Sequence, residues 1–169
     1  MNGSHICDIP RDTGYFNVCH ICGVPLDANN FDVADIKKAP TSTDPEQVLV
    51  RFALHPQYCG VLLYFAQHAE PEAEALQDRK IFKTPGYEWV ILCNEQPRDP
   101  YLPTDVVRNP WGENAFPVHL RLEEGCVVKF VVRKVPAPAG EEIPLKQVGG
   151  RLVGRYWYNT MYGGAPNRL

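Results

Sequence analysis

Short runs of apolar residues, some alternating with polar residues and some uninterrupted, follow one another along the chain from residue 46 onward. The runs 116–121 and 129–133 alternate, as strands that bury one face do. The remaining runs are apolar segments of strand length. The pattern predicts strands at 47–54, 59–67, 80–83, 87–93, 116–122, 126–135 and 152–158.

Segments rich in proline and glycine separate these runs. The chain has 16 prolines and 13 glycines, and short strands with frequent breakers are typical of antiparallel β structure. Residues 55–58 predict a hairpin connection between the first two strands. One short helix is expected at 70–79, where proline and acidic residues stand near the start and an arginine near the end. The fold class indicated is mainly β, an antiparallel β-sandwich of the jelly-roll or C2-like kind.

The domain organisation follows from a change in composition near residue 40. Residues 1–40 are rich in Asp, Asn, Gly and Pro and hold only short apolar islands, which predicts an N-terminal appendage organised around its cysteines. The joint at 39–45 contains two prolines and should be extended or turned. We expect the β-sandwich domain at 46–158 and a polar C-terminal tail at 159–169.

Composition and charge exclude several classes of protein. Among the 169 residues, 44% are hydrophobic and 22% charged, close to globular averages, so disorder and coiled coils are disfavoured. The net charge of −3 and the scattered basic residues argue against specific nucleic-acid binding. No apolar run approaches the roughly 20 residues of a membrane helix. The first residues lack the features of a secretory signal, which favours an intracellular, reducing compartment.

The cysteines carry the strongest chemical signal. Cys93 and Cys126 lie in apolar strand-like runs, where a reduced cysteine behaves as a small buried hydrophobe. Cys19 and Cys22 form a Cys-x-x-Cys-Gly knuckle, in which a tight turn places two thiolates on one side. Proline at position 25 prevents the helix that a thioredoxin-like redox motif needs after its cysteines. The knuckle therefore indicates a structural zinc site.

A tetrahedral zinc site needs four nitrogen or sulfur ligands. The N-terminal segment offers Cys7, Cys19 and Cys22, with His5 as the nearest fourth ligand. Cys59 and His55 are alternative fourth ligands, and either would fasten the appendage to the sandwich. Thiols that are reduced and carry no metal are the competing interpretation.

Aromatic residues and arginines gather near the C-terminus, a composition enriched at protein interfaces. The alternative interpretation is that the aromatic residues complete a last core strand. The expected partners are other protein subunits. The predicted interface residues are Arg151, Arg155, Tyr156, Trp157, Tyr158 and Tyr162.

No catalytic motif stands out. The five histidines lie in no recognisable nucleophile motif, and the chain lacks the glycine-rich sequences of nucleotide-binding enzymes. The leading hypothesis is a non-enzymatic accessory or structural subunit of a larger assembly, such as an organellar complex or a viral particle. A metal-dependent ligand-binding sandwich or enzyme is the second hypothesis, and it requires His55, His68 and His119 to converge with a carboxylate.

A third hypothesis rests on a short resemblance. The sequences that begin at Arg98 (Arg-Asp-Pro-Tyr-Leu) and at Asn109 (Asn-Pro-Trp-Gly-Glu-Asn-Ala-Phe) resemble pieces of C2 domains, which are β-sandwiches that often bind calcium and lipid. This resemblance implies a lipid-binding module. Calcium needs several carboxylates on adjoining loops, and Asp99 and Asp105 are the acids nearby.

Overall fold

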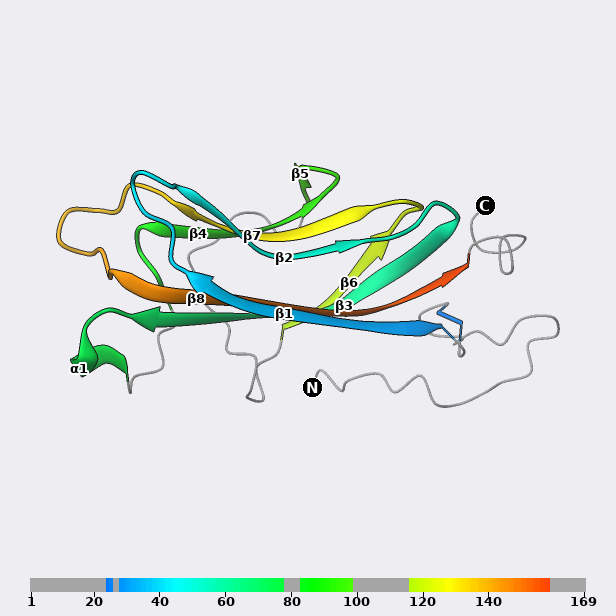
Figure 1. Cartoon of the computed structure of the whole chain (residues 1–169), viewed down its shortest axis with the longest axis horizontal. Coiled ribbons are helices and arrows are strands. Elements are labelled where there is room, and N and C mark those ends of the chain that lie inside the picture. The colour runs from blue at the N-terminus through cyan, green and yellow to red at the C-terminus, as the bar shows by residue number, and fades with distance from the viewer. Residues whose placement is uncertain (1–23, 26–27, 78–82, 99–115, 159–169) are drawn as a thin grey trace.

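The protein is a mainly β molecule in which two antiparallel sheets of four strands pack face to face (Figure 1). The computed structural model describes residues 24–25, 28–77, 83–98 and 116–158. The side chains of 75, 77 and 116–119 are not described. The predicted fold class, an antiparallel β-sandwich, is confirmed.

Eight strands form the two sheets. One sheet has the order β1–β8–β3–β6, and the other has the order β2–β7–β4–β5. The strands are β1 (Asn29–Lys38), β2 (Glu46–Ala53), β3 (Tyr58–Pro71), β4 (Tyr87–Cys93), β5 (Gln96–Pro97), β6 (Phe116–Leu122), β7 (Val127–Lys134) and β8 (Leu145–Tyr158).

The strand pairings are nested. β1 pairs with β8, β2 with β7, β3 with β6 and β4 with β5, all antiparallel. Further pairing of β3 with β8 and of β4 with β7 completes the two sheets. A long antiparallel hairpin that is rolled so that its strand pairs alternate between two sheets has this pairing, which is the jelly-roll arrangement.

Local patterns located several strands well. β4 and β6 have the predicted bounds, and β7 lies within the predicted 126–135. The predicted hairpin at 55–58 is wrong, because β2 and β3 belong to different sheets. Residues 55–58 do form a tight turn, in which the Tyr58 amide donates to the His55 carbonyl at 3.0 Å. The turn is an arch between the two sheets, since each of its strands pairs with a partner distant in sequence.

Other elements extend beyond their predicted bounds. β1 lies within the 1–40 segment assigned to the appendage, yet it pairs with β8 as an edge strand of the sandwich. β8 starts at Leu145 rather than at 152. β3 continues to Pro71, into the segment predicted as helix, and the helix α1 (Glu74–Gln77) follows it. No helix in the described part of the chain has the length and apolar character that a membrane crossing requires.

The core lies between the two sheets and is centred on Phe130 of β7. Its ring packs against Phe65 in a T-shaped arrangement and against Trp89 in a tilted one, with centroids 5.6 and 6.0 Å apart. The indole of Trp89 donates to the Thr84 hydroxyl at 3.0 Å, so the polar atom of this buried side chain has a partner. Leu49, Leu62, Leu122 and Leu152 are also almost fully buried.

Two adjacent glycines of β8 face opposite sides of the sheet. A Cβ on Gly150 would stand 2.6 Å from Cδ1 of Phe130 and 3.1 Å from Cδ1 of Leu49, so this glycine faces the core. A Cβ on Gly149 would instead meet Cγ1 of Ile36 at 3.1 Å, the backbone oxygen of Asp35 at 3.2 Å and Cβ of His68 at 3.3 Å, on the outer face. The alternation of strand side chains accounts for this difference.

We therefore expect Gly150→Ala to destabilise the fold by about 1–3 kcal/mol, because the added methyl group would overlap the buried side chain of Phe130. Gly149→Ala is the matched control, since Ile36 can move toward solvent. The free energy of unfolding of Gly149→Ala should stay within about 1 kcal/mol of the wild-type value. Alanine lowers the conformational entropy of the unfolded chain, and this offsets part of any loss. Urea unfolding of the two variants measures the difference. Equal destabilisation would contradict the assigned orientation of β8.

Candidate functional site

The predicted zinc ligands fall largely outside the described residues. Cys7, Cys19, Cys22 and His5 all precede residue 24, so the zinc site stays a prediction. Within the described part of the chain, no group of three or more His, Cys, Asp and Glu side chains is arranged to hold a metal ion. The two alternative fourth ligands lie in different places: Cys59 is buried in β3, and His55 is exposed in the arch.

Cys59 lies beside a small apolar cluster on the outer face of the β1–β8–β3–β6 sheet. We call this the outer cluster; it consists of Val24, Ala28, Val61, Leu63 and Trp157. Cys59 precedes Val61 by two positions along β3 and pairs with Trp157, so its side chain points to the same face. Burial raises the pKa of the Cys59 thiol, and the Arg121 charge opposes that shift.

Val24, the first described residue after the knuckle, lies on the same face of the sheet as Cys59. Val24 is buried in the outer cluster, and Cys22 precedes it by two residues, a distance of at most about 7 Å. We therefore test Cys59 first among the two alternative fourth ligands. His55 lies in the arch at the end of the sandwich.

The prediction that Cys93 and Cys126 are buried and reduced is confirmed, since both side chains are 2% exposed and neither forms a disulfide. A hydrogen bond between the two thiols lowers the pKa of Cys126 and raises that of Cys93. Burial raises the pKa of Cys93 further. Both cysteines belong to the main core and fill it as small side chains.

The aromatic residues of the predicted interface are used within the chain. Tyr156 packs against the core, with its ring 5.9 Å from that of Phe52. Trp157 belongs to the outer cluster, and the Tyr158 hydroxyl donates to Oε1 of Gln57 at 2.8 Å. These contacts fit the alternative of a last core strand, and the interface role of these residues stays a prediction.

The arginines of the predicted interface are also engaged. Arg151 Nε donates to Oδ1 of Asp32 at 2.8 Å, and this guanidinium holds the pKa of Asp32 below its usual value. Arg155 donates to the carbonyl of Ala28 at 3.1 Å. Tyr162 lies outside the described residues.

The described histidines do not converge. His55 and His68 line two separate hollows that share no residue. The side chain of His119 lies outside the described residues, as do Asp99 and Asp105, the acids of the C2 comparison. The histidine cluster of the metal-dependent hypothesis therefore does not form from the two members whose side chains are described.

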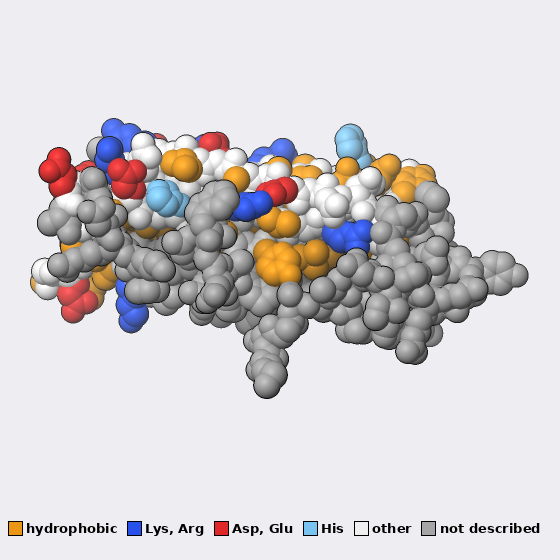
Figure 2. Space-filling view, turned by 90° about the horizontal axis from the view of Figure 1, so that it is seen from below, with side chains coloured by type: hydrophobic (Ala, Val, Ile, Leu, Met, Phe, Trp, Pro, Cys, Tyr) orange, Lys and Arg blue, Asp and Glu red, His pale blue; other side chains and the backbone are white. Residues whose placement is uncertain are grey.

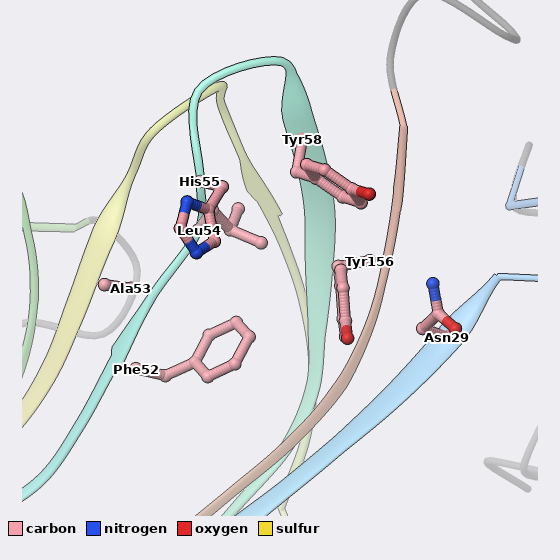
Figure 3. Close-up of a pocket in the computed structure, with 7 residues that line it drawn as sticks. All are labelled: Asn29, Phe52, Ala53, Leu54, His55, Tyr58 and Tyr156. Atoms are coloured by element: carbon pink, nitrogen blue, oxygen red, sulfur yellow. The ribbon is translucent and has the colours of Figure 1, made fainter.

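The first hollow lies where the two sheets part at one end of the sandwich, and we call it the mouth cleft (Figure 3). Its volume is about 350 Å³. Phe52, Tyr58 and Tyr156 come from β2, β3 and β8 and bring three aromatic rings to it. The other lining residues are Asn29, Ala53, Leu54 and His55.

The second hollow lies over β1, β8 and β3, and we call it the sheet hollow. Its volume is about 470 Å³. Figure 2 views the molecule from the side of this sheet and shows hydrophobic side chains next to charged ones near its middle. The lining residues are Ala34, Asp35, Ile36, Ala66, Gln67, His68, Gly149, Gly150 and Arg151.

Sequence reasoning missed most residues of both hollows. Phe52 and Tyr58 read as ordinary strand residues, and only their positions on either side of the Pro56 turn hint at a shared end of the sandwich. Ile36 does carry a sequence signal, since it is an apolar residue between Asp35 and two lysines.

No protein-family model, curated protein or solved structure matches the chain.

If the zinc prediction holds, elemental analysis of the purified chain should find one equivalent of zinc, and Cys19→Ser should abolish it. If Cys59 rather than His5 or His55 is the fourth ligand, Cys59→Ala should lower the zinc content as well, because it removes a thiolate from the site. Cys93→Ala is the matched control, a buried cysteine of the main core, and should keep the metal. Zinc retained in Cys59→Ala would exclude Cys59 as a ligand, and a metal-free wild type would exclude the site.

Proposed function

We propose that this protein is a non-enzymatic structural or accessory subunit of a multiprotein assembly, such as an organellar complex or a viral particle. It contacts neighbouring copies of itself through the outer face of β1, β8 and β3. The observation that carries the proposal is Ile36, whose side chain is 59% exposed beside the sheet hollow. A single exposed apolar side chain is common on protein surfaces, so the argument depends on what surrounds it.

Small residues form the floor of the sheet hollow. Ile36 pairs with Gly149 across β1 and β8, and His68 pairs with Gly149 from the other side. Ala34 and Ala66 flank Arg151 in the next row. Gly149 has no side chain and the alanines have only methyl groups. The sheet surface is therefore depressed between the larger side chains around them, and the depression can accept a side chain from another molecule.

Ile36 protrudes beside the sheet hollow, and this arrangement favours a contact between two copies of the chain. In a two-fold symmetric contact the same patch serves both subunits, so Ile36 of each copy would enter the hollow of the other. The ion pair of Arg151 with Asp32 borders the hollow. An apolar centre with a polar rim is the usual anatomy of a protein interface.

We expect light scattering coupled to size-exclusion chromatography to give a mass above that of one chain. The mass should increase as the protein concentration is raised from low micromolar to submillimolar. Ile36→Asp should weaken this association by about tenfold or more, since truncation or charging of a buried interface anchor costs at least about 1.4 kcal/mol. Ala139→Asp, a change at another exposed residue in the β7–β8 connection, should associate like the wild type.

A wild-type chain that stays monomeric throughout this concentration range would overturn the proposal. Equal association of the wild type and Ile36→Asp would also overturn it, because the contact would then use another face.

A further inference from the structure

The mouth cleft combines aromatic rings held in fixed positions. The rings of Tyr58 and Phe52 lie 5.8 and 5.9 Å from that of Tyr156, tilted by 52° and 56°. Phe31 stacks behind Phe52 with centroids 4.0 Å apart and planes within 12°. Figure 3 shows the rings of Phe52, Tyr58 and Tyr156 around the cleft. Because each of these rings packs against another ring, the cleft is preorganised for a ligand.

Polar groups that have no hydrogen-bond partner among the described residues surround these rings. The amide of Asn29, the imidazole of His55 and the hydroxyls of Tyr58 and Tyr156 make no hydrogen bond within the described part of the chain. By contrast, the neighbouring Tyr158 uses its hydroxyl in a bond to Gln57. The four groups of the cleft therefore remain available to a ligand, and each can both donate and accept a hydrogen bond.

The arch fixes the rim of the cleft. His55 and Tyr58 are the first and last residues of its turn, closed by the 3.0 Å hydrogen bond from the Tyr58 amide to the His55 carbonyl. Pro56 follows His55, and Gln57 has φ = 72°, which together are the features of a type II turn. A glutamine in this left-handed region is held at a cost of about 1–2 kcal/mol. This conformation sets the spacing of the two rim side chains.

The charge of the cleft limits its ligand. None of the seven lining residues is Asp, Glu, Lys or Arg, so an ionic ligand would lose its hydration without gaining a counter-charge. A purely apolar ligand would bury polar groups without partners, at about 1–3 kcal/mol for each. A neutral ligand that carries both hydroxyl groups and an apolar ring face satisfies both conditions.

We infer that the mouth cleft binds a neutral sugar, a single pyranose unit of a glycan or glycoside. The C–H face of the pyranose packs on the rings of Tyr58 and Tyr156. Its hydroxyls exchange hydrogen bonds with Asn29, His55 and the tyrosine hydroxyls. A volume of about 350 Å³ suits a ligand of this size, near the lower end of the roughly 300–1,000 Å³ of small-molecule sites. A proline-rich peptide, the other common occupant of aromatic clefts, offers only acceptors along its backbone.

The experiment is a saturation-transfer NMR titration of the full-length protein with the methyl glycosides of glucose, galactose, mannose and N-acetylglucosamine. We expect millimolar binding of at least one of them. Tyr58→Phe and Asn29→Ala each remove one neutral hydrogen-bonding group and should weaken binding by about two- to tenfold. His55→Ala should weaken it similarly, while His68→Ala, the matched change in the sheet hollow, should leave it unchanged.

Circular dichroism and urea midpoints verify that each variant is folded. The inference is overturned if no glycoside binds up to its solubility limit, or if binding survives His55→Ala and Asn29→Ala unchanged. Tighter binding of a proline hexapeptide than of any glycoside, with loss in Tyr58→Phe, would assign the cleft to peptides and overturn the sugar. Ile36→Asp should bind the glycoside normally. Glycoside binding and self-association are therefore tested independently, and the failure of one proposal does not affect the other.

Discussion

The packing of Phe130 onto the glycine surface of β8 is the contact on which the sandwich depends. Phe130 lies at the centre of β7 and is 1% exposed. Gly150, directly opposite in the other sheet, leaves the space that its ring fills. Phe65 and Trp89 then pack against the same ring, one from each sheet. The separation of the sheets, and therefore the shape of the open end where the mouth cleft lies, follows from this close approach.

The same stretch of β8 links the core to the outer surface. Because side chains alternate along a strand, Gly150 serves the core while Gly149 forms the floor of the sheet hollow. The aromatic residues further along β8 are divided in the same way, with Tyr156 facing the mouth cleft and Trp157 the outer cluster. One strand therefore contributes to the core and to every surface feature discussed above.

The strands of the sandwich were predictable wherever an apolar or alternating run was uninterrupted, as in β4 and β6. The first half of β8 was not predictable, because two adjacent glycines normally interrupt a strand. In this fold Gly149 and Gly150 instead leave room for neighbouring side chains to pack. The arch at His55 to Tyr58 has the sequence of a tight turn, and a turn does not reveal which sheet its strands will join. The mouth cleft was beyond sequence reasoning, since its rings come from strands that meet only through the nested pairing.

The nested pairing also sets the order in which the strands can pair during folding. Arg151 and Asp32 face each other across β8 and β1, yet they are 119 residues apart in sequence. During synthesis β1 emerges early and has no partner until β8 leaves the ribosome, because β8 is the strand that pairs with it. Closing so long a loop is entropically costly, and folds dominated by such contacts form slowly. The charged residues of β1, including Asp32, Asp35, Lys37 and Lys38, protect this waiting edge from pairing with other chains.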